Sequence, residues 1–169
     1  LEVDAPEAAE ALDDVRGRIN HLVNNPGHTR PATFHRRLGE ILYAGCGVSR
    51  SEEGLKRALE RVQELREEFW RDVRVTGTDD RLNQELEKAG RVADFLELAE
   101  LMITDALDRQ ESCGAHFREE YALPDGEAKR DDECWCNVSA WETNPAGQHR
   151  RYQEPLRFES VKLQVRNYR

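Results

Sequence analysis

Four residues in the last third of the chain carry side chains that zinc prefers. Cys113 and His116 are separated by two residues, and Cys134 and Cys136 by one. Two thiols at positions i and i+2 of a strand would face the same way, and cysteine with histidine is a sensible zinc ligand set. Two paired CxxC motifs would be a far stronger signal. We therefore expect free thiols packed in loops and keep a zinc site as the alternative.

Three histidines recur every seven residues, at His21, His28 and His35. This spacing would bring their rings to one face of a continuous helix. Pro26 and Pro31 lie between them, however, and proline interrupts a helix. We interpret these residues as surface or capping histidines rather than as metal ligands.

The densest charged segments are residues 111–118 and 130–135, which combine arginine, aspartate and histidine. Bidentate arginine–carboxylate bonds could fix such a loop internally, and the same charges could equally dock on a charged partner. The sequence contains no nucleophile elbow, glycine-rich dinucleotide loop or phosphate loop. The chain alone therefore predicts no catalytic group.

The composition is that of a polar, acidic protein. Of the 169 residues, 38% are hydrophobic and 35% are charged, with a formal net charge of -9. That charge argues against nucleic acid as a partner, because phosphate binding needs a cationic surface. No run of 18 apolar residues occurs, so we expect no membrane-spanning helix. The chain begins at Leu1 and its only methionine is Met102, which leads us to expect a piece of a longer protein.

Apolar residues three and four positions apart predict four amphipathic helices in the first two-thirds of the chain. Their expected ranges are about 6–24, 31–45, 52–76 and 82–109. Ser51 is a suitable N-cap for the third helix, and Gly90 in the fourth is expected to allow a close helix crossing. The apolar stripe of the first helix consists of Leu12, Val15, Ile19 and Leu22. Such helices bury their stripes against one another, which predicts a mainly α fold built on an antiparallel bundle.

Glycine and proline punctuate the chain after residue 109, which predicts an irregular tail. Residues 135–141 have strand-like composition, and Val161, Leu163 and Val165 alternate with polar residues, so we expect a short strand pair. We divide the chain into a helical bundle domain, residues 1–110, and an extended docking tail, residues 111–169. Because the tail cannot form its own core, we expect it to lie on the surface of a neighbour.

The two charged segments resemble a motif near the C-terminus of succinate dehydrogenase and fumarate reductase flavoproteins. That motif reads roughly E-S-R-G-A-H, an arginine or aspartate two residues on, and then R-D-D-E-x-W. The matching positions here are Glu111, Ser112, Gly114, Ala115, His116 and Arg118, followed by Arg130, Asp131, Asp132, Glu133 and Trp135. Cys113 stands where most members have arginine, as in a bacterial subgroup of the family, so no role of that arginine is carried over. Residues 83–94 are similar to the helix before the motif, and residues 162–169 to the basic-aromatic terminus.

The resemblance implies a non-catalytic C-terminal domain of a flavoprotein subunit that interconverts succinate and fumarate, coupled to quinone. FAD and the catalytic residues of that family belong to upstream domains, so we assign no cofactor, metal or catalytic residue here. The implied partners are the flavin-binding domain of the same chain, the iron–sulfur subunit and, indirectly, a membrane cytochrome subunit. The implied location is peripheral, at the cytoplasmic face of the inner membrane. The residues expected to dock or order the tail are Ser112, Gly114, His116, Arg118, Arg130, Asp131, Asp132 and Trp135.

Two alternatives remain from the sequence. The C-terminal bundle of aspartate oxidase carries a related motif, although its tail is generally shorter. A free-standing helical interaction module, stabilised by zinc at the cysteine and histidine positions above, is the alternative from a different class.

Overall fold

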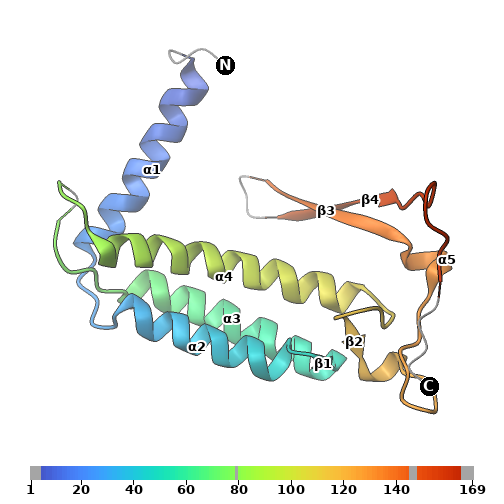
Figure 1. The fold of residues 1–169 in the computed structure, drawn as a ribbon. Coiled ribbons are helices and arrows are strands. Elements are labelled where there is room, and N and C mark those ends of the chain that lie inside the picture. Colours follow the sequence, from blue (N-terminus) through green and yellow to red (C-terminus); the bar gives the residue numbers. More distant parts are fainter. Residues whose placement is uncertain (1–4, 79, 145–147, 165–169) are drawn as a thin grey trace.

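The structure is a computed structural model that describes residues 5–78, 80–144 and 148–164. Long helices dominate its first two-thirds, and a two-stranded hairpin forms most of the remainder (Figure 1). The helices are α1 (Pro6–Asn24), α2 (Pro31–Gly45), α3 (Glu52–Asp72), α4 (Gln84–Asp108) and the short α5 (Asp132–Trp135), with a 3-10 turn, η1 (Glu119–Tyr121). The strands are β1 (Ser49–Arg50), β2 (Phe117–Arg118), β3 (Asn137–Thr143) and β4 (His149–Pro155).

The helices begin where local chemistry favours it. Pro6 and Pro31 occupy the first turn of α1 and α2, where the missing N–H of proline has no cost. The Ser51 hydroxyl accepts a hydrogen bond from the Gly54 N–H at 3.1 Å, which confirms Ser51 as the N-cap of α3. Asn83 caps α4 in the same way by accepting from the Glu85 and Leu86 N–H groups.

The bundle consists of α2, α3 and α4, with α3 antiparallel to the other two (Figure 1). Its core contains two aromatic rings, Phe34 and Phe69, in edge-to-face contact with their centroids 5.2 Å apart. Around them lie aliphatic side chains of all three helices, including Leu38, Leu55, Val62, Leu65, Leu96 and Ile103. The predicted mainly α fold with an antiparallel bundle is therefore confirmed. No helix in the described part of the chain is long and apolar enough to cross a membrane.

The expectation that α1 buries its whole apolar stripe is wrong. The helix projects away from the end of the bundle (Figure 1), and Leu12 and Val15 are 49% and 54% exposed, whereas Leu22 is buried. Arg18 supplies the contact with α4, through the Gly90 carbonyl at 3.2 Å and the Asp94 carboxylate. Periodicity identifies the helix, but it does not say whether this chain supplies the surface that covers the stripe.

Two further expectations need correction. A Cβ added to Gly90 would meet no atom within 4 Å, so this glycine does not mediate a close helix crossing. The predicted strand pair exists, but the partner of β3 is β4, in antiparallel register from Asn137 opposite Pro155 to Thr143 opposite His149. Val161 and Leu163 are exposed and outside any strand, and Val165 lies outside the described residues.

Candidate functional site at the end of helix α4

The residues of the 111–118 motif form a closed loop at the C-terminal end of α4. Ser112 is fully buried, and its hydroxyl accepts a hydrogen bond from the Arg118 N–H at 2.8 Å and donates to the Arg118 carbonyl at 3.1 Å. Between them, Cys113 and His116 exchange two backbone hydrogen bonds around Gly114, whose φ of +58° suits glycine in the turn. One serine thus closes the loop and fixes the position of Arg118.

Arg118 is buried beneath this loop and points its charge at the helix end. Its side chain is bonded to the carbonyls of Ala106 and Leu107 at 2.9 and 3.3 Å, and to the Glu120 carboxylate at 3.1 Å. The last carbonyls of a helix lack intrahelical partners and carry partial negative charge, so a guanidinium is well placed there. Arg118 also belongs to β2. This strand pairs with β1, which lies between α2 and α3 in the sequence.

His116 joins the loop to the bundle as a neutral imidazole. Its Nδ1 lies 2.9 Å from Nη1 of Arg50, and its Nε2 lies 2.9 Å from the carbonyl of Arg109. Because a guanidinium can only donate, Nδ1 is the acceptor and Nε2 carries the hydrogen. Burial and the three neighbouring arginines (Arg50, Arg109 and Arg118) lower the pKa of His116, which favours this neutral state.

Glu111 connects the two motif segments. This buried carboxylate accepts from Arg109 at 2.8 and 2.5 Å through one oxygen, and from the Asp131 N–H at 2.9 Å through the other. Arg109 also donates to the Trp135 carbonyl at 3.0 Å. The Ser112 N–H adds a backbone bond to the Lys129 carbonyl. The two segments predicted from the sequence therefore meet at one place, which we call the junction: residues 109–118 and 129–135 with Arg50.

The remaining predicted residues order the outer part of the junction. Arg130 donates to Asp132 at 3.0 and 2.5 Å and to the Gln164 carbonyl at 2.8 Å, and the Asp132 contact raises the pKa of Arg130. Asp131 caps α5 by accepting from the Cys134 N–H. Two guanidinium groups lie over the Trp135 ring, from Arg109 at 5.9 Å and Arg151 at 5.4 Å from its centroid.

The hairpin is fixed to α4 through Trp141 and Arg151, which lie opposite each other in β3 and β4. The Trp141 indole N–H donates to Asp105 at 2.8 Å, and Arg151 pairs with Asp108. These two carboxylates lie on the last turn of α4, so β3 and β4 extend from the junction back above the helix towards α1 (Figure 1).

Sequence reasoning missed Arg50 and Arg109 of the junction and also Arg151, which contacts Trp135 from β4, and it did not assign a role to Glu111. Arg109 and Glu111 adjoin the motif, and an arginine two residues from a glutamate is a local signal for an ion pair. Arg50 and Arg151 are far from the motif in sequence, and only the fold brings them to it.

The zinc alternative finds no support in the geometry. Both ring nitrogens of His116 have hydrogen-bond partners, and Cys134 is exposed beside Asp131, which raises the pKa of its thiol. Within residues 5–78, 80–144 and 148–164, no group of three or more potential ligands is placed to hold a metal ion. The four cysteines are free thiols.

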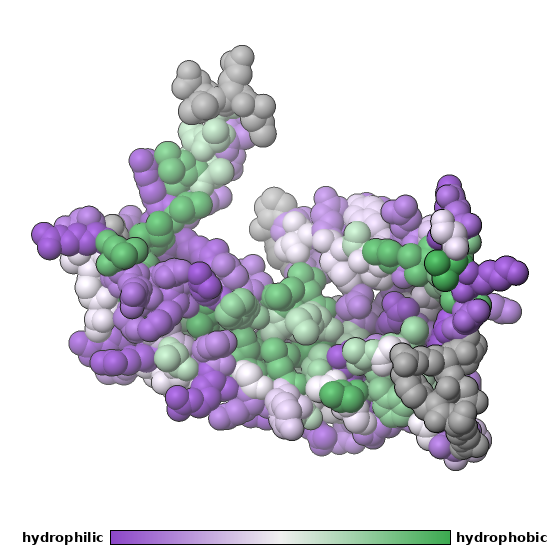
Figure 2. All heavy atoms as spheres, in the orientation of Figure 1, coloured by the Kyte–Doolittle hydropathy of each residue, from purple (hydrophilic) through white to green (hydrophobic). Residues whose placement is uncertain are grey.

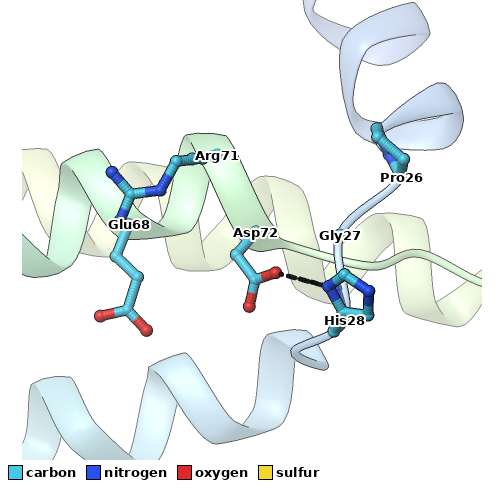
Figure 3. A pocket seen from close by; sticks show the side chains of 6 residues that line it. All are labelled: Pro26, Gly27, His28, Glu68, Arg71 and Asp72. Atoms are coloured by element: carbon cyan, nitrogen blue, oxygen red, sulfur yellow. Dashed lines mark hydrogen bonds and ion pairs between the residues drawn. The ribbon is translucent and has the colours of Figure 1, made fainter.

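The three regularly spaced histidines lie apart and make separate contacts. His21 bonds to the Trp70 carbonyl at 2.9 Å, and the ring of His35 packs on Phe95. His28 bonds to Asp72 at 3.1 Å beside a surface pocket of about 440 Å³ (Figure 3). Asp72 also accepts from Thr29, and these bonds lower its pKa. These bonds hold the loop after α1 against the end of α3.

Three arginines of the junction, Arg109, Arg118 and Arg130, are thus bonded to carboxylates of the chain and to backbone carbonyls. The chain is similar to known proteins over most of its length. The family model described as "Fumarate reductase flavoprotein C-term" matches residues 35–168. The fumarate reductase flavoprotein subunit of Proteus vulgaris is 30% identical over 162 residues, 94% of this chain and 25% of that subunit. The corresponding subunit of Escherichia coli (strain K12) is 35% identical over 118 residues, 70% of this chain and 19% of that subunit.

Solved structures agree with this assignment of the fold. The FrdA chain of E. coli quinol fumarate reductase superposes with a TM-score of 0.77 at 29% identity, covering 94% of this chain and 26% of that one. Adenylylsulfate reductase from Archaeoglobus fulgidus has a TM-score of 0.72 at 17% identity over 93% of this chain and 26% of its own, which shows a shared fold alone. The chain spans about a quarter of the length of the curated relatives that it matches first.

Proposed function

We propose a function for this chain from its family: it belongs to the fumarate reductase flavoprotein C-terminal family. In this proposal it is the structural C-terminal domain of a subunit that interconverts succinate and fumarate. The observation that carries the proposal is the correspondence of 94% of this chain with about a quarter of fumarate reductase flavoprotein subunits. The domain holds no part of the reaction centre in this proposal. Its role is to complete and support the subunit that does.

The internal pairing of the junction supports a structural role. Arg118 and Glu111 are buried and bonded within the chain, so neither is available to bind a substrate. Arg130 likewise donates hydrogen bonds to Asp132 and to the Gln164 carbonyl. We infer that these residues, with Ser112, order the tail so that its outer surface can dock.

The glycine turn of the junction does not suit FAD. A dinucleotide site needs backbone N–H groups at a glycine-rich turn before a helix, whereas Gly114 lies in a turn that leads into β2. We therefore place FAD in the upstream part of the parent subunit. This domain would dock on that flavin-binding part and lie near the iron–sulfur subunit, with a membrane cytochrome subunit as an indirect partner.

The parent complex would be peripheral at the cytoplasmic face of the inner membrane and exchange electrons with quinone. An antibody raised against this chain tests the proposal on native membranes. The expected result is a membrane-associated band several times heavier than 19.5 kDa that shows flavin fluorescence under denaturing conditions. A band at 19.5 kDa in the soluble fraction would overturn the proposal.

The role of the junction is tested separately by Arg130→Ala in the whole subunit. We expect reduced flavin content, complex assembly and turnover, because the tail loses its link between Asp132 and residue 164. Arg57→Ala is the matched control, since Arg57 is exposed on α3 and pairs with its helical neighbour Glu53. If Arg130→Ala behaved as Arg57→Ala in all three measurements, the docking role of the junction would be wrong.

A further inference from the structure

Two free thiols lie where the junction meets the hairpin. Cys134 is exposed in α5, and Cys136 is the partly buried residue directly after that helix. In Figure 1, α5 lies at the outer margin of the molecule, and Figure 2 shows both hydrophobic and hydrophilic side chains at the surface there. Small molecules in solution can therefore reach this segment.

The spacing of the two cysteines allows a disulfide bond between them. Adjacent Cα atoms are about 3.8 Å apart, so two residues separated by one other residue lie about 5–7 Å apart. Disulfides join residues whose Cα atoms are about 4.4–6.8 Å apart. Cys136 has a φ of -76° and a ψ of 58°, which are not helical values. The backbone thus already leaves the helix at the point where the two side chains would have to turn towards each other.

The segment between the thiols links the junction to the hairpin. The Trp135 carbonyl accepts a hydrogen bond from Arg109 at 3.0 Å, and the Cys136 carbonyl accepts one at 3.0 Å from the N–H of Leu156, which directly follows β4. α5 is only four residues long, and so short a helix resists little distortion. A bond between the two sulfur atoms would turn these carbonyls, so oxidation would weaken the link.

We propose that Cys134 and Cys136 form a reversible oxidation site, which peroxides convert into a disulfide that loosens the hairpin from the junction. One thiol attacks the peroxide, the O–O bond breaks, and a sulfenic acid forms as one water leaves. The other thiol then attacks the sulfenic sulfur, and a second water leaves as the Sγ–Sγ bond forms. One hydrogen peroxide is thus reduced to two waters by the two electrons and two hydrogens that the thiol pair loses.

Such a disulfide would be labile rather than a permanent structural link. It closes a loop with a single residue between the cysteines, and closing so short a loop removes little entropy from the unfolded chain. Disulfides that are strained or exposed are also the ones that reductants open readily. The pair is therefore expected to return to thiols when the oxidant is removed.

Trypsin isolates the two thiols in one peptide, which makes the product directly measurable. Residues 131–150 follow Arg130, end at Arg150, and contain no other cysteine, lysine or internal arginine. The intact parent subunit is treated with hydrogen peroxide, its remaining thiols are alkylated, and the mass of this peptide is measured. We expect an unalkylated peptide that is lighter by two hydrogen atoms than the reduced one. Treatment with reduced glutathione should restore both thiols.

Other products would overturn the proposal. A cross-link to residues 110–118 would make Cys113 the partner instead. Full alkylation of residues 131–150, or addition of oxygen to them, would show that no bond forms between the two thiols. A disulfide that resists glutathione would be a structural link. Cys46 is buried in the bundle and serves as the internal control, which should remain a thiol.

Hydrogen exchange tests the effect of oxidation on the hairpin. Amides of β3 should exchange at least about tenfold faster in the oxidised than in the reduced subunit, because strain around the disulfide weakens the link. Cys136→Ser cannot form the pair and should exchange at the same rate with and without peroxide. Cys113→Ser is the matched control, since it keeps both thiols and should respond as the wild type does. Equal rates in oxidised and reduced wild-type subunit, or a response that persists in Cys136→Ser, would overturn the proposal.

Discussion

The guanidinium of Arg118 lies 2.9 Å from the carbonyl of Ala106, although the two residues are twelve positions apart in the sequence. The side chain is 1% exposed and caps the end of α4 from beneath the loop that Ser112 closes. A buried arginine is rare unless it is paired, and here the helix carbonyls and Glu120 satisfy it. This contact joins the bundle to everything that follows α4.

Replacing Arg118 by alanine should therefore destabilise the domain. The carbonyls of Ala106 and Leu107 would lose their donor while remaining largely buried, and we expect the free energy of unfolding to fall by about 3 kcal/mol. Urea denaturation measures this change. Arg57→Ala, which removes an exposed ion pair on α3, should change it by less than about 1 kcal/mol. Equal effects of the two substitutions would show that the Arg118 contacts contribute little.

The lowered pKa of His116 makes stability depend on pH. The native state binds fewer protons at this ring than the unfolded state does, so stability rises with pH across the window between the native pKa and the ordinary value. The contribution is complete above the ordinary value of about 6.5 and is lost as pH falls through that value towards the lower native pKa. His116→Gln should flatten the stability profile in this window. His149→Gln is the control, since its exposed ring lies in β4 outside the junction, and a flattened profile for this variant as well would refute the assignment to His116.

The bundle could be predicted because its signals are local. Pro31, Ser51 and the spacing of apolar residues each act within one helix, and the structure has α2 and α3 where those signals indicate. The extent of burial is not local. Leu12 and Val15 have the same spacing as core residues yet remain exposed, because no element in the described part of the chain covers them.

The junction was predictable as a group of residues but not as a set of contacts. The motif led to Ser112, Arg118 and Arg130, yet charged residues usually lie at the surface, and nothing in the sequence showed that Arg118 would be buried. The hairpin was harder, because β4 contains polar residues such as Arg150 and Gln153 without apolar alternation. Its position is set by antiparallel pairing with β3, which periodicity in one strand cannot reveal.

The hairpin should depend on the bond between Trp141 and Asp105. Trp141→Phe keeps an aromatic ring but removes the indole N–H, and we expect a loss of about 1 kcal/mol in the local stability of β3 and β4. Hydrogen exchange of the strand amides measures this opening. A double-mutant cycle with Asp105→Ala isolates the pairwise energy, and a coupling energy near zero would contradict the anchoring role.

Two glycines should respond to alanine in opposite directions. A Cβ on Gly45 would lie 2.6 Å from the Cβ of Ala58 and 2.9 Å from the Gly54 carbonyl oxygen, so α2 and α3 would have to separate. Overpacking of this kind costs about 1–3 kcal/mol, and Gly45→Ala should lower the free energy of unfolding accordingly. Gly90 lies inside α4 with open space at its Cβ position, so Gly90→Ala should stabilise the domain by about 0.5–1 kcal/mol through helix propensity. Urea denaturation of both variants measures the change in the free energy of unfolding, and its sign distinguishes the packing effect from the helix-propensity effect. A stabilising Gly45→Ala would mean that the α2–α3 crossing is looser than the structure places it.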